Sequence, residues 1–215
     1  MYGQPCKTLY PAWMRFDRAT FHAYVDRSKV QNAHYTRHRA EMTIRQAAVA
    51  IVLSAGETGD ELLLVRRATV DGDPWSGHLA LPGGGREATD PTLVDTARRE
   101  TLEETGIDLS GSTCVARLTP VTPSSMAAPA ITIAPFVFRY DGDRSVTMSR
   151  EIVESWWIPL EQLQRDGAWT TTPVTIRDGS AIHVRGFLWH GYVLWGLTER
   201  ILNEFLTSAT ERQAL

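Results

Sequence analysis

The stretch Arg99-Glu-Thr-Leu-Glu-Glu-Thr-Gly-Ile107 closes a segment whose apolar residues recur at helical intervals. Asp90 and Pro91 precede that segment and are typical of a helix N-cap and of the first helical residue. Gly106 is typical of a helix C-terminus, because glycine adopts the left-handed conformation required there without steric cost. We therefore predict a helix over residues 91–105.

Three glutamates share one face of this predicted helix. Glu100, Glu103 and Glu104 are spaced i, i+3, i+4, which places their carboxylates within reach of one another. Their mutual repulsion destabilises the helix unless a cation or an arginine lies nearby. Oxygen-only carboxylate sites with open positions suit Mg²⁺ or Mn²⁺. A solvated acidic face without a metal is the alternative that this pattern leaves open.

The segment before the helix has the pattern of a β-hairpin followed by a glycine-rich loop. Residues 46–53 and 61–67 are short apolar runs separated by a Gly/Asp turn at 56–60. A longer loop then leads to Leu79-Ala-Leu-Pro-Gly-Gly-Gly85, whose glycines permit close approaches that a Cβ would block. We expect this loop to hold a bound group.

The rest of the sequence predicts further strands and helices without internal repeats. The expected strands lie near residues 113–119, 131–140, 152–158 and 174–184, and the expected helices near 159–165 and 187–206. We assign residues 1–44 to an N-terminal extension with one helix near 16–25, residues 45–206 to a single α+β domain, and residues 207–215 to a C-terminal tail.

The composition of the 215-residue chain is that of a globular protein, with 43% hydrophobic and 22% charged residues. A net charge of -3 argues against nucleic-acid binding, which requires a basic surface. Cys6 and Cys114 lie far apart, which argues against a zinc site and a disulfide framework. No segment reaches the roughly 20 consecutive apolar residues of a membrane span, and the first residues lack the apolar run of a signal peptide. We therefore expect a cytoplasmic protein that does not bind membranes.

Pro82-Gly83-Gly84, together with the glutamate-rich stretch 99–107, resembles the signature of the Nudix hydrolases. The downstream half matches the family pattern R-E-U-x-E-E-x-G-U, in which U is apolar, except at Thr101. The resemblance implies a Nudix-type α/β/α sandwich with a mixed β-sheet and a catalytic loop, helix and loop. It also implies a pyrophosphohydrolase that acts on a nucleoside diphosphate linked to another moiety.

Three features resemble the coenzyme A pyrophosphatase branch of that family. The interval from Gly83 to Arg99 is one residue longer than usual, and Asp90 lies where this branch has an aspartate. Gly77-His-Leu-Ala-Leu-Pro-Gly-Gly84 is similar to the G-Q-x-x-F-P-G-G element of the branch. Leu194-Trp-Gly-Leu-Thr198 is similar to its (I/L)-W-G-x-T element.

Two departures accompany these similarities. Pro91 stands where the common signature has a glutamate, so Asp90 or Glu87 must replace that glutamate structurally. The loop of residues 69–76 lacks the arginine that the coenzyme A branch carries, and it is one residue longer. The resemblance therefore indicates the reaction but leaves the substrate open.

The resemblance also assigns the helix residues of the site. It makes Glu100, Glu103 and Glu104 metal-facing carboxylates, and the Gly83 carbonyl becomes a further ligand of Mg²⁺ or Mn²⁺. Arg99 is expected to orient the helix carboxylates through an ion pair rather than to contact the substrate.

Many relatives recruit a further acid from a loop before a late strand. Glu151 lies eight residues before Pro159, the interval seen in the coenzyme A branch, and we assign it to metal binding and catalysis. Glu154 is the rival, for which a salt bridge or an edge position is the alternative interpretation. Either Glu100 or Glu151 would act as the general base, a choice that the sequence leaves open.

Substrate contacts are expected from the end of the second predicted strand and from the glycine loop. Arg66 and Arg67 close that strand, and arginine forks match phosphate oxygens. Strand alternation allows only one of the two to face the site. We also assign Gly84 to substrate binding.

The leading interpretation is a metal-dependent pyrophosphatase that converts coenzyme A or acyl-coenzyme A to 4′-phosphopantetheine and adenosine 3′,5′-bisphosphate. One alternative is a hydrolase of another nucleotide, such as ADP-ribose or a nucleoside di- or triphosphate. A non-catalytic nucleotide-binding module is the alternative of another class, although the three retained glutamates favour the enzyme. The sequence leaves open whether the protein forms a homodimer.

Overall fold

The computed structural model describes residues 44–73, 75–123, 131–176 and 179–213, with side chains as far as residue 208. Residues Thr43–Thr207 form one compact unit. The helix expected near residues 16–25 lies outside the described residues.

The elements follow one another in a βα order typical of a mixed fold. In chain order they are β1 (Arg45–Ala55), β2 (Asp60–Arg67), β3 (Leu79–Ala80), β4 (Gly83–Gly85), α2 (Leu93–Thr105), β5 (Thr113–Arg117), β6 (Ile131–Arg139), β7 (Ile152–Pro159), α3 (Leu160–Gln164), β8 (Trp169–Thr175), β9 (Ala181–Trp189), β10 (Tyr192–Leu194) and α4 (Leu197–Gln213).

β1 lies at the centre of a seven-stranded mixed sheet with the order β3-β2-β1-β6-β5, in which β4 also pairs with β1 and β7 with β2. β1 and β6 run parallel, from Arg45 opposite Ile131 to Leu53 opposite Arg139. The other pairs in this sheet are antiparallel. A separate three-stranded antiparallel sheet has the order β10-β9-β8.

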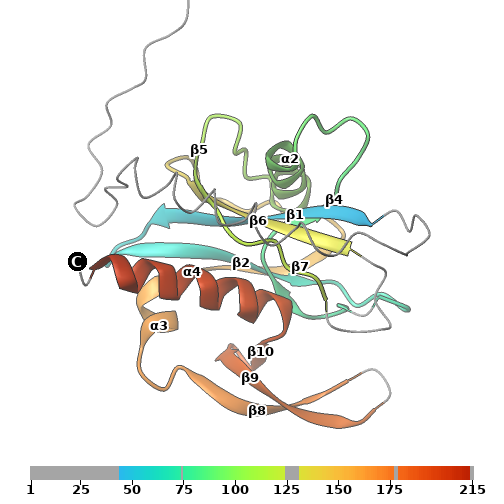
Figure 1. Cartoon of the computed structure of the whole chain (residues 1–215), viewed down its shortest axis with the longest axis vertical. Coiled ribbons are helices and arrows are strands. Elements are labelled where there is room, and N and C mark those ends of the chain that lie inside the picture. Colours follow the sequence, from blue (N-terminus) through green and yellow to red (C-terminus); the bar gives the residue numbers. More distant parts are fainter. Residues whose placement is uncertain (1–43, 74, 124–130, 177–178, 214–215) are drawn as a thin grey trace, which may run out of the picture. The chain divides into compact units, whose positions relative to one another are not determined.

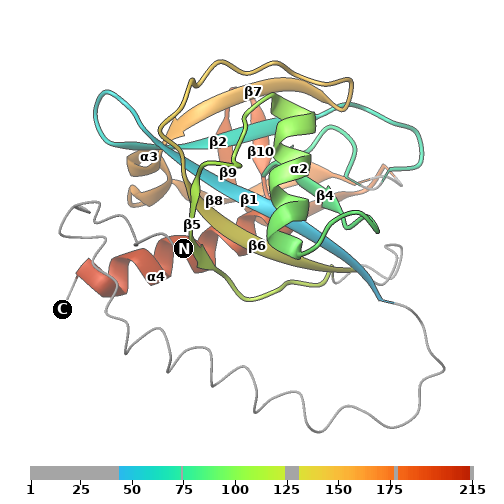
Figure 2. The same ribbon diagram turned by 90° about the horizontal axis from the view of Figure 1, so that it is seen from above.

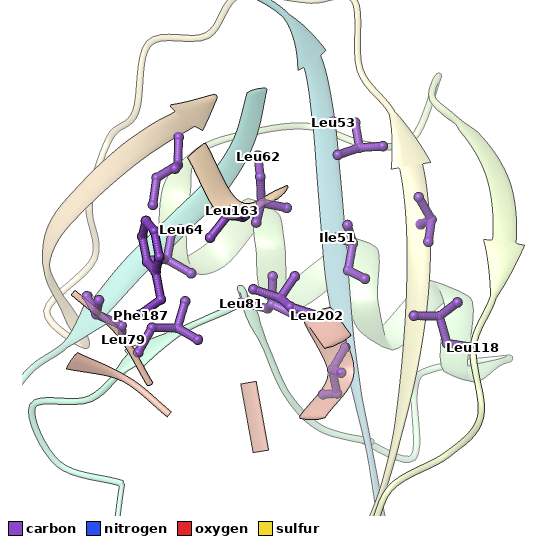
Figure 3. Close-up of a cluster of buried hydrophobic side chains, with 14 of the residues drawn as sticks. Ile51, Leu53, Leu62, Leu64, Leu79, Leu81, Leu118, Leu163, Phe187 and Leu202 are labelled. Atoms are coloured by element: carbon purple, nitrogen blue, oxygen red, sulfur yellow. The ribbon is translucent and has the colours of Figure 1, made fainter. Parts of the chain in front are cut away.

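Helices cover both faces of the large sheet: α2 lies on one side and α4 on the other (Figure 1). Successive side chains of a strand point to opposite faces. Along β1, Ala50 and Val52 therefore join the buried cluster beneath α2. Ile51 and Leu53 join the larger cluster on the α4 side (Figure 3). This arrangement confirms the predicted α/β/α sandwich with a mixed sheet.

α2 crosses the sheet above β1 (Figure 2) and begins two residues later than predicted, at Leu93. Thr92, not Asp90, is the N-cap: its hydroxyl accepts from the Asp95 N–H, and the Asp95 carboxylate accepts from the Thr92 N–H. The prediction was wrong because this reciprocal capping box follows the proline and outweighs the Asp-Pro signal. Gly106 ends the helix with φ 73°, as predicted.

The C-terminal part of the domain differs more from its prediction. The single strand expected over residues 174–184 is a hairpin of β8 and β9, and the helix expected from residue 187 begins at Leu197. His190 and Gly191 have φ values of 47° and 86°, typical of a two-residue hairpin turn, so β9 reverses into β10 there. The aromatic residues of this segment therefore belong to the strands β9 and β10 and not to a helix.

The remaining predicted elements agree with the structure to within a few residues, namely the strands β1, β2, β5, β6 and β7 and the helix α3. In the part of the chain that the structure describes, no helix is long and apolar enough to cross a membrane.

Candidate active site

β4 brings the glycine loop against the centre of the sheet, with Gly83 opposite Val49 of β1. Gly83 has φ 152°, and a Cβ at this position would lie 2.3 Å from the Ala48 carbonyl oxygen. At Gly84 a Cβ would lie 2.5 Å from the carboxyl carbon of Glu100 on α2. Gly83 requires glycine because the backbone of β1 crowds it, whereas a side chain at position 84 would displace the Glu100 carboxylate.

Glu104 is a buried acid of α2, with 4% of its surface exposed. One carboxylate oxygen accepts from the Gly83 N–H at 2.9 Å, and the other lies 4.0 Å from Nη1 of Arg67. Burial, together with the negative charges of Glu100 and Glu151, raises the pKa of Glu104 to about 7 against the opposing effects of that N–H and of Arg67. Glu104 therefore lies among like charges that its protein contacts do not neutralise.

The other acids of the site differ in exposure. Burial raises the pKa of Glu100, as do the charges of Glu103 and Glu151, while an ion pair with Arg99 at 3.0 Å opposes the increase. Glu103 is exposed and also pairs with Arg99, at 3.0 Å. Glu151 is exposed in the turn before β7, and its carbonyl accepts from the Ala68 N–H at 2.7 Å. We call Glu100, Glu104 and Glu151 the acidic cluster.

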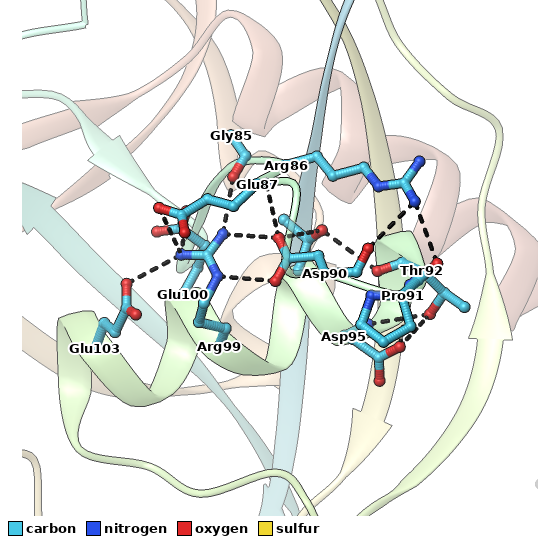
Figure 4. Close-up of polar contacts among 11 residues, drawn as sticks. Gly85, Arg86, Glu87, Asp90, Pro91, Thr92, Asp95, Arg99, Glu100 and Glu103 are labelled. Atoms are coloured by element: carbon cyan, nitrogen blue, oxygen red, sulfur yellow. Dashed lines mark hydrogen bonds and ion pairs between the residues drawn. The ribbon is translucent and has the colours of Figure 1, made fainter.

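Arg99 connects the glycine strand to the helix and lies among carboxylates and a backbone carbonyl (Figure 4). Its Nε and Nη2 donate to the two carboxylate oxygens of Asp90, each at 2.9 Å. Nη2 also donates to the Gly85 carbonyl at 2.9 Å, and Nη1 contacts Glu100 and Glu103. The side chain that the resemblance assigns to orienting the helix carboxylates thus contacts two of them directly.

Asp90 rather than Glu87 occupies the position that faces Arg99. Asp90 is 5% exposed and accepts from the Glu87 N–H and the Thr96 hydroxyl, both at 2.9 Å. The bidentate bond from Arg99 holds the pKa of Asp90 well below its usual range, although burial alone would raise it. Glu87 itself is exposed and lies 4.0 Å from Arg99.

Arg66 and Arg67 point to different partners, as strand alternation requires, and a register shift in the β2–β7 pairing lies between them. Arg67 faces α2 and Glu104. Arg66 donates to the Glu154 carboxylate from Nε at 3.0 Å and lies 4.5 Å from the Tyr192 ring centroid. Tyr192 also donates to Glu154 at 2.9 Å. Glu154 therefore forms a salt bridge away from the acidic cluster.

Asp73 belongs to the same neighbourhood, although the sequence analysis did not single it out. Its carboxylate accepts from Nη2 of Arg67 at 2.9 Å. The one signal that could have indicated this residue is its place in the loop of residues 69–76, where the coenzyme A branch has an arginine and this chain has acids.

The two sequence elements that resemble the coenzyme A branch meet in space. The ring of His78 lies 5.0 Å from that of Trp195, and the Thr198 hydroxyl donates to the Leu79 carbonyl at 3.2 Å. The start of α4 is thereby attached to β3, next to the glycine strand.

The chemistry of the acidic cluster fits a divalent cation, because neighbouring carboxylates raise the pKa values of Glu100 and Glu104 and added positive charge stabilises such carboxylates. Within the described ranges, no three histidine, cysteine, aspartate or glutamate side chains are already arranged as a set of metal ligands. Arg99 holds Glu100 and Glu103, and the Gly83 N–H occupies one oxygen of Glu104.

Residues 44–178 match the family model described as NUDIX domain. This chain belongs to the Nudix family. It is a Nudix pyrophosphohydrolase that acts on nucleoside diphosphate derivatives, and Nudix hydrolases generally use divalent metal ions.

Two of three similar curated proteins carry the Nudix name. The chain is 29% identical over 178 residues to the uncharacterized Nudix hydrolase NudL of Cronobacter sakazakii, which covers 81% of this chain and 88% of that protein. NudL of Salmonella newport is 28% identical, with 89% and 95% covered. The uncharacterized protein C14C4.10c of Schizosaccharomyces pombe is 34% identical over 140 residues, which are 55% of this chain and only 43% of that relative.

Among solved structures, a MutT/nudix family protein from Enterococcus faecalis superposes with a TM-score of 0.54 at 16% identity, covering 92% of this chain and 72% of that chain. This likeness shows that the two proteins share a fold.

Proposed function

We propose that this Nudix enzyme is a pyrophosphatase that depends on Mg²⁺ or Mn²⁺ and has coenzyme A or acyl-coenzyme A as its main substrate. The observation that carries the proposal is the acidic cluster, in which buried Glu104 is bonded to the Gly83 N–H and surrounded by the charges of Glu100 and Glu151. An anionic phosphoanhydride requires charge neutralisation and a positioned water more than it requires a covalent nucleophile.

The metal would be held by the acidic cluster, by Glu103 and by the Gly83 carbonyl. When bound, the ion supplies positive charge to the phosphate oxygens. Arg99 fixes the helix carboxylates relative to β4 through its contacts with Asp90 and the Gly85 carbonyl. Glu100 or Glu151 takes the proton from the attacking water.

The remaining assignments place the substrate beside β2 and β4. Arg67 would bind a phosphate oxygen, since it faces the acidic cluster. Arg66 is less suited to this role because Glu154 and Tyr192 already occupy its guanidinium. Gly84 would allow the substrate to approach the backbone.

One observation supports coenzyme A as the substrate class, and one favours the alternative. The contacts of His78 with Trp195 and of Thr198 with Leu79 join the two elements that resemble the coenzyme A branch. The loop of residues 69–76 lacks the arginine of that branch, which favours a nucleotide without a 3′-phosphate, such as ADP-ribose.

A substrate panel tests the proposal. Coenzyme A, dephospho-coenzyme A and ADP-ribose are incubated with the enzyme, with and without Mg²⁺ or Mn²⁺, and kcat/KM is measured for each. We expect coenzyme A to yield 4′-phosphopantetheine and adenosine 3′,5′-bisphosphate with the highest kcat/KM, because a site built around the 3′-phosphate leaves cations unpaired with the other two. Equal or better efficiency on ADP-ribose would move the assignment to that substrate. Binding without any turnover would indicate a non-catalytic module.

A further inference from the structure

The loop after β2 folds back onto the strand that it leaves. The Arg67 N–H donates to the His78 carbonyl at 3.0 Å, which joins the two ends of the loop. Inside it, the Asp73 N–H donates to the Val70 carbonyl at 3.2 Å, and the Ser76 N–H donates to the Asp73 carbonyl at 3.2 Å. These bonds hold the backbone of Asp73 opposite the end of β2.

The Asp73 side chain uses its two oxygens for different purposes. One accepts from the Trp75 N–H at 3.0 Å, which fixes the carboxylate to its own loop. The other accepts from Nη2 of Arg67 at 2.9 Å. The side chain is only 16% exposed, so water competes weakly for this ion pair. Asp73 therefore holds one edge of the guanidinium in a fixed position.

The opposite edge of the same guanidinium is held close to the acidic cluster without being bonded to it. Nη1 of Arg67 lies 4.0 Å from the nearest Glu104 oxygen, beyond hydrogen-bond distance, and makes no hydrogen bond among the described residues. Nε is buried and has no partner in the described structure either. The fork is thus oriented by Asp73 while its Nη1 donors stay available next to Glu104.

We propose that Asp73 is a positioning residue of the active site, which holds Arg67 so that its Nη1 donates to a phosphate oxygen of the nucleoside diphosphate substrate. This inference rests on the proposed function, because it requires an anionic substrate beside the acidic cluster. A long arginine side chain without this partner samples many rotamers, and its fork is then seldom aligned with phosphate.

A double-mutant cycle tests this role. Asp73→Asn keeps the shape of the side chain and an oxygen for the Trp75 N–H but removes the charge that holds Arg67. We expect kcat/KM to fall about tenfold, mainly through KM, and Arg67→Gln to lower it by about tenfold to a hundredfold. Since Asp73 acts through Arg67, the double variant should be no worse than Arg67→Gln alone. Asp73→Glu should restore part of the loss.

Asp71→Asn is the matched control, since Asp71 is exposed in the same loop. It should leave kcat/KM unchanged. If the losses from Asp73→Asn and Arg67→Gln multiply in the double variant, Asp73 acts independently of Arg67 and the inference is wrong. A loss that appears only as a lower Tm, with kcat/KM unchanged, would also overturn it.

Calorimetric titration of the same variants with ADP in Mg²⁺ buffer separates this inference from the proposed function. If the protein hydrolyses no nucleotide but the variants lose affinity for ADP in the same non-additive way, the inference is retained and the catalytic proposal is refuted. If the enzyme hydrolyses the nucleotide but the losses of the two single variants are additive, the catalytic proposal is retained and the inference is refuted. If the enzyme neither binds ADP nor hydrolyses a nucleotide, both the inference and the proposed function are wrong.

Discussion

Asp90 and Glu104 lie near opposite ends of the loop and helix that carry the site, and both have little contact with solvent, with 5% and 4% of their surfaces exposed. Their pKa values nevertheless shift in opposite directions. The pKa of Asp90 is held well below its usual range, chiefly by the hydrogen bonds from Arg99. Burial raises that of Glu104 to about 7.

The difference lies in the depth of burial, since loss of hydration is the largest effect on the pKa of Glu104, and in the donors that face each carboxylate. Asp90 receives two guanidinium N–H groups, a backbone N–H and a hydroxyl, which together offset the cost of removing its charge from water. Glu104 receives one backbone N–H, and its nearest cation stays 4.0 Å away. Burial alone therefore does not indicate the role of an acid. Asp90 attaches the loop to the helix through Arg99. Among the described residues, Glu104 has no direct ion pair within hydrogen-bond distance, so its carboxylate can bind an added cation.

The largest effect expected from the contrast between Asp90 and Glu104 is a loss of turnover when Glu104 is changed. Glu104→Gln removes the unneutralised charge and keeps the shape, and we expect kcat to fall by about 10³-fold or more because the reaction depends on electrostatic stabilisation. Steady-state kinetics at saturating Mg²⁺ measure the change. Glu161→Gln, an exposed acid of α3, is the matched control. A Glu104→Gln enzyme with a tenth of wild-type activity would contradict the assignment of Glu104.

The next effect compares two acids at the start of β7. Glu151 contributes to the raised pKa of Glu104, whereas Glu154 is bonded to Arg66 and Tyr192. We expect Glu151→Gln to lower kcat about a hundredfold and Glu154→Gln to change it by about threefold or less. The same kinetic assay decides between them. The reverse order would show that Glu154 is the functional acid and that the interval to Pro159 was the wrong basis for choosing Glu151.

The pH dependence of stability should separate the two ends of the helix in metal-free protein. Because the folded-state pKa of Glu104 is raised from 4.5 to about 7, the folded state gains relative stability at low pH and loses it as the pH rises through that range. The loss amounts to about 3 kcal/mol in the free energy of unfolding. Urea titrations with EDTA between pH 4.5 and pH 8 should show a larger decline in wild type than in Glu104→Gln, in which only the raised pKa of Glu100 still contributes. An equal decline in both proteins would show that groups other than Glu104 cause the pH dependence of the free energy of unfolding.

The smallest expected effect is on stability at the Asp90 end. Asp90→Asn removes the buried carboxylate that accepts two hydrogen bonds from Arg99, and the free energy of unfolding at pH 7 should fall by about 2 kcal/mol. Since the folded-state pKa of Asp90 is lowered, wild type should also lose this contribution as the pH falls below about 4. Urea unfolding measures both, with exposed Asp71→Asn as the control. If Asp90→Asn is as stable as wild type, the ion pair with Arg99 contributes nothing and the contrast between the two acids fails.

The sequence predicted the elements whose pattern has a single interpretation. The apolar runs of β1 and β2, the stop of α2 at Gly106 and the grouping of three glutamates on one helix face all follow from side-chain type and spacing. The start of α2 was misplaced because two capping signals overlap within five residues, at Asp90 and Thr92. The segment from residue 187 was misassigned because its aromatic residues suit either period, and only the turn at His190 and Gly191 separates the alternatives.

By itself the sequence determined that Arg99, Glu100, Glu103 and Glu104 lie together on a single helix, because their spacing is local. Only the tertiary structure decided how these groups differ in charge and exposure. The pairing of β4 with β1 brings the Gly83 N–H to Glu104, and the loop after β2 brings Asp73 to Arg67. A pKa depends on every charge and dipole within a few ångströms, and contacts between elements distant in the chain cannot be obtained from local spacing.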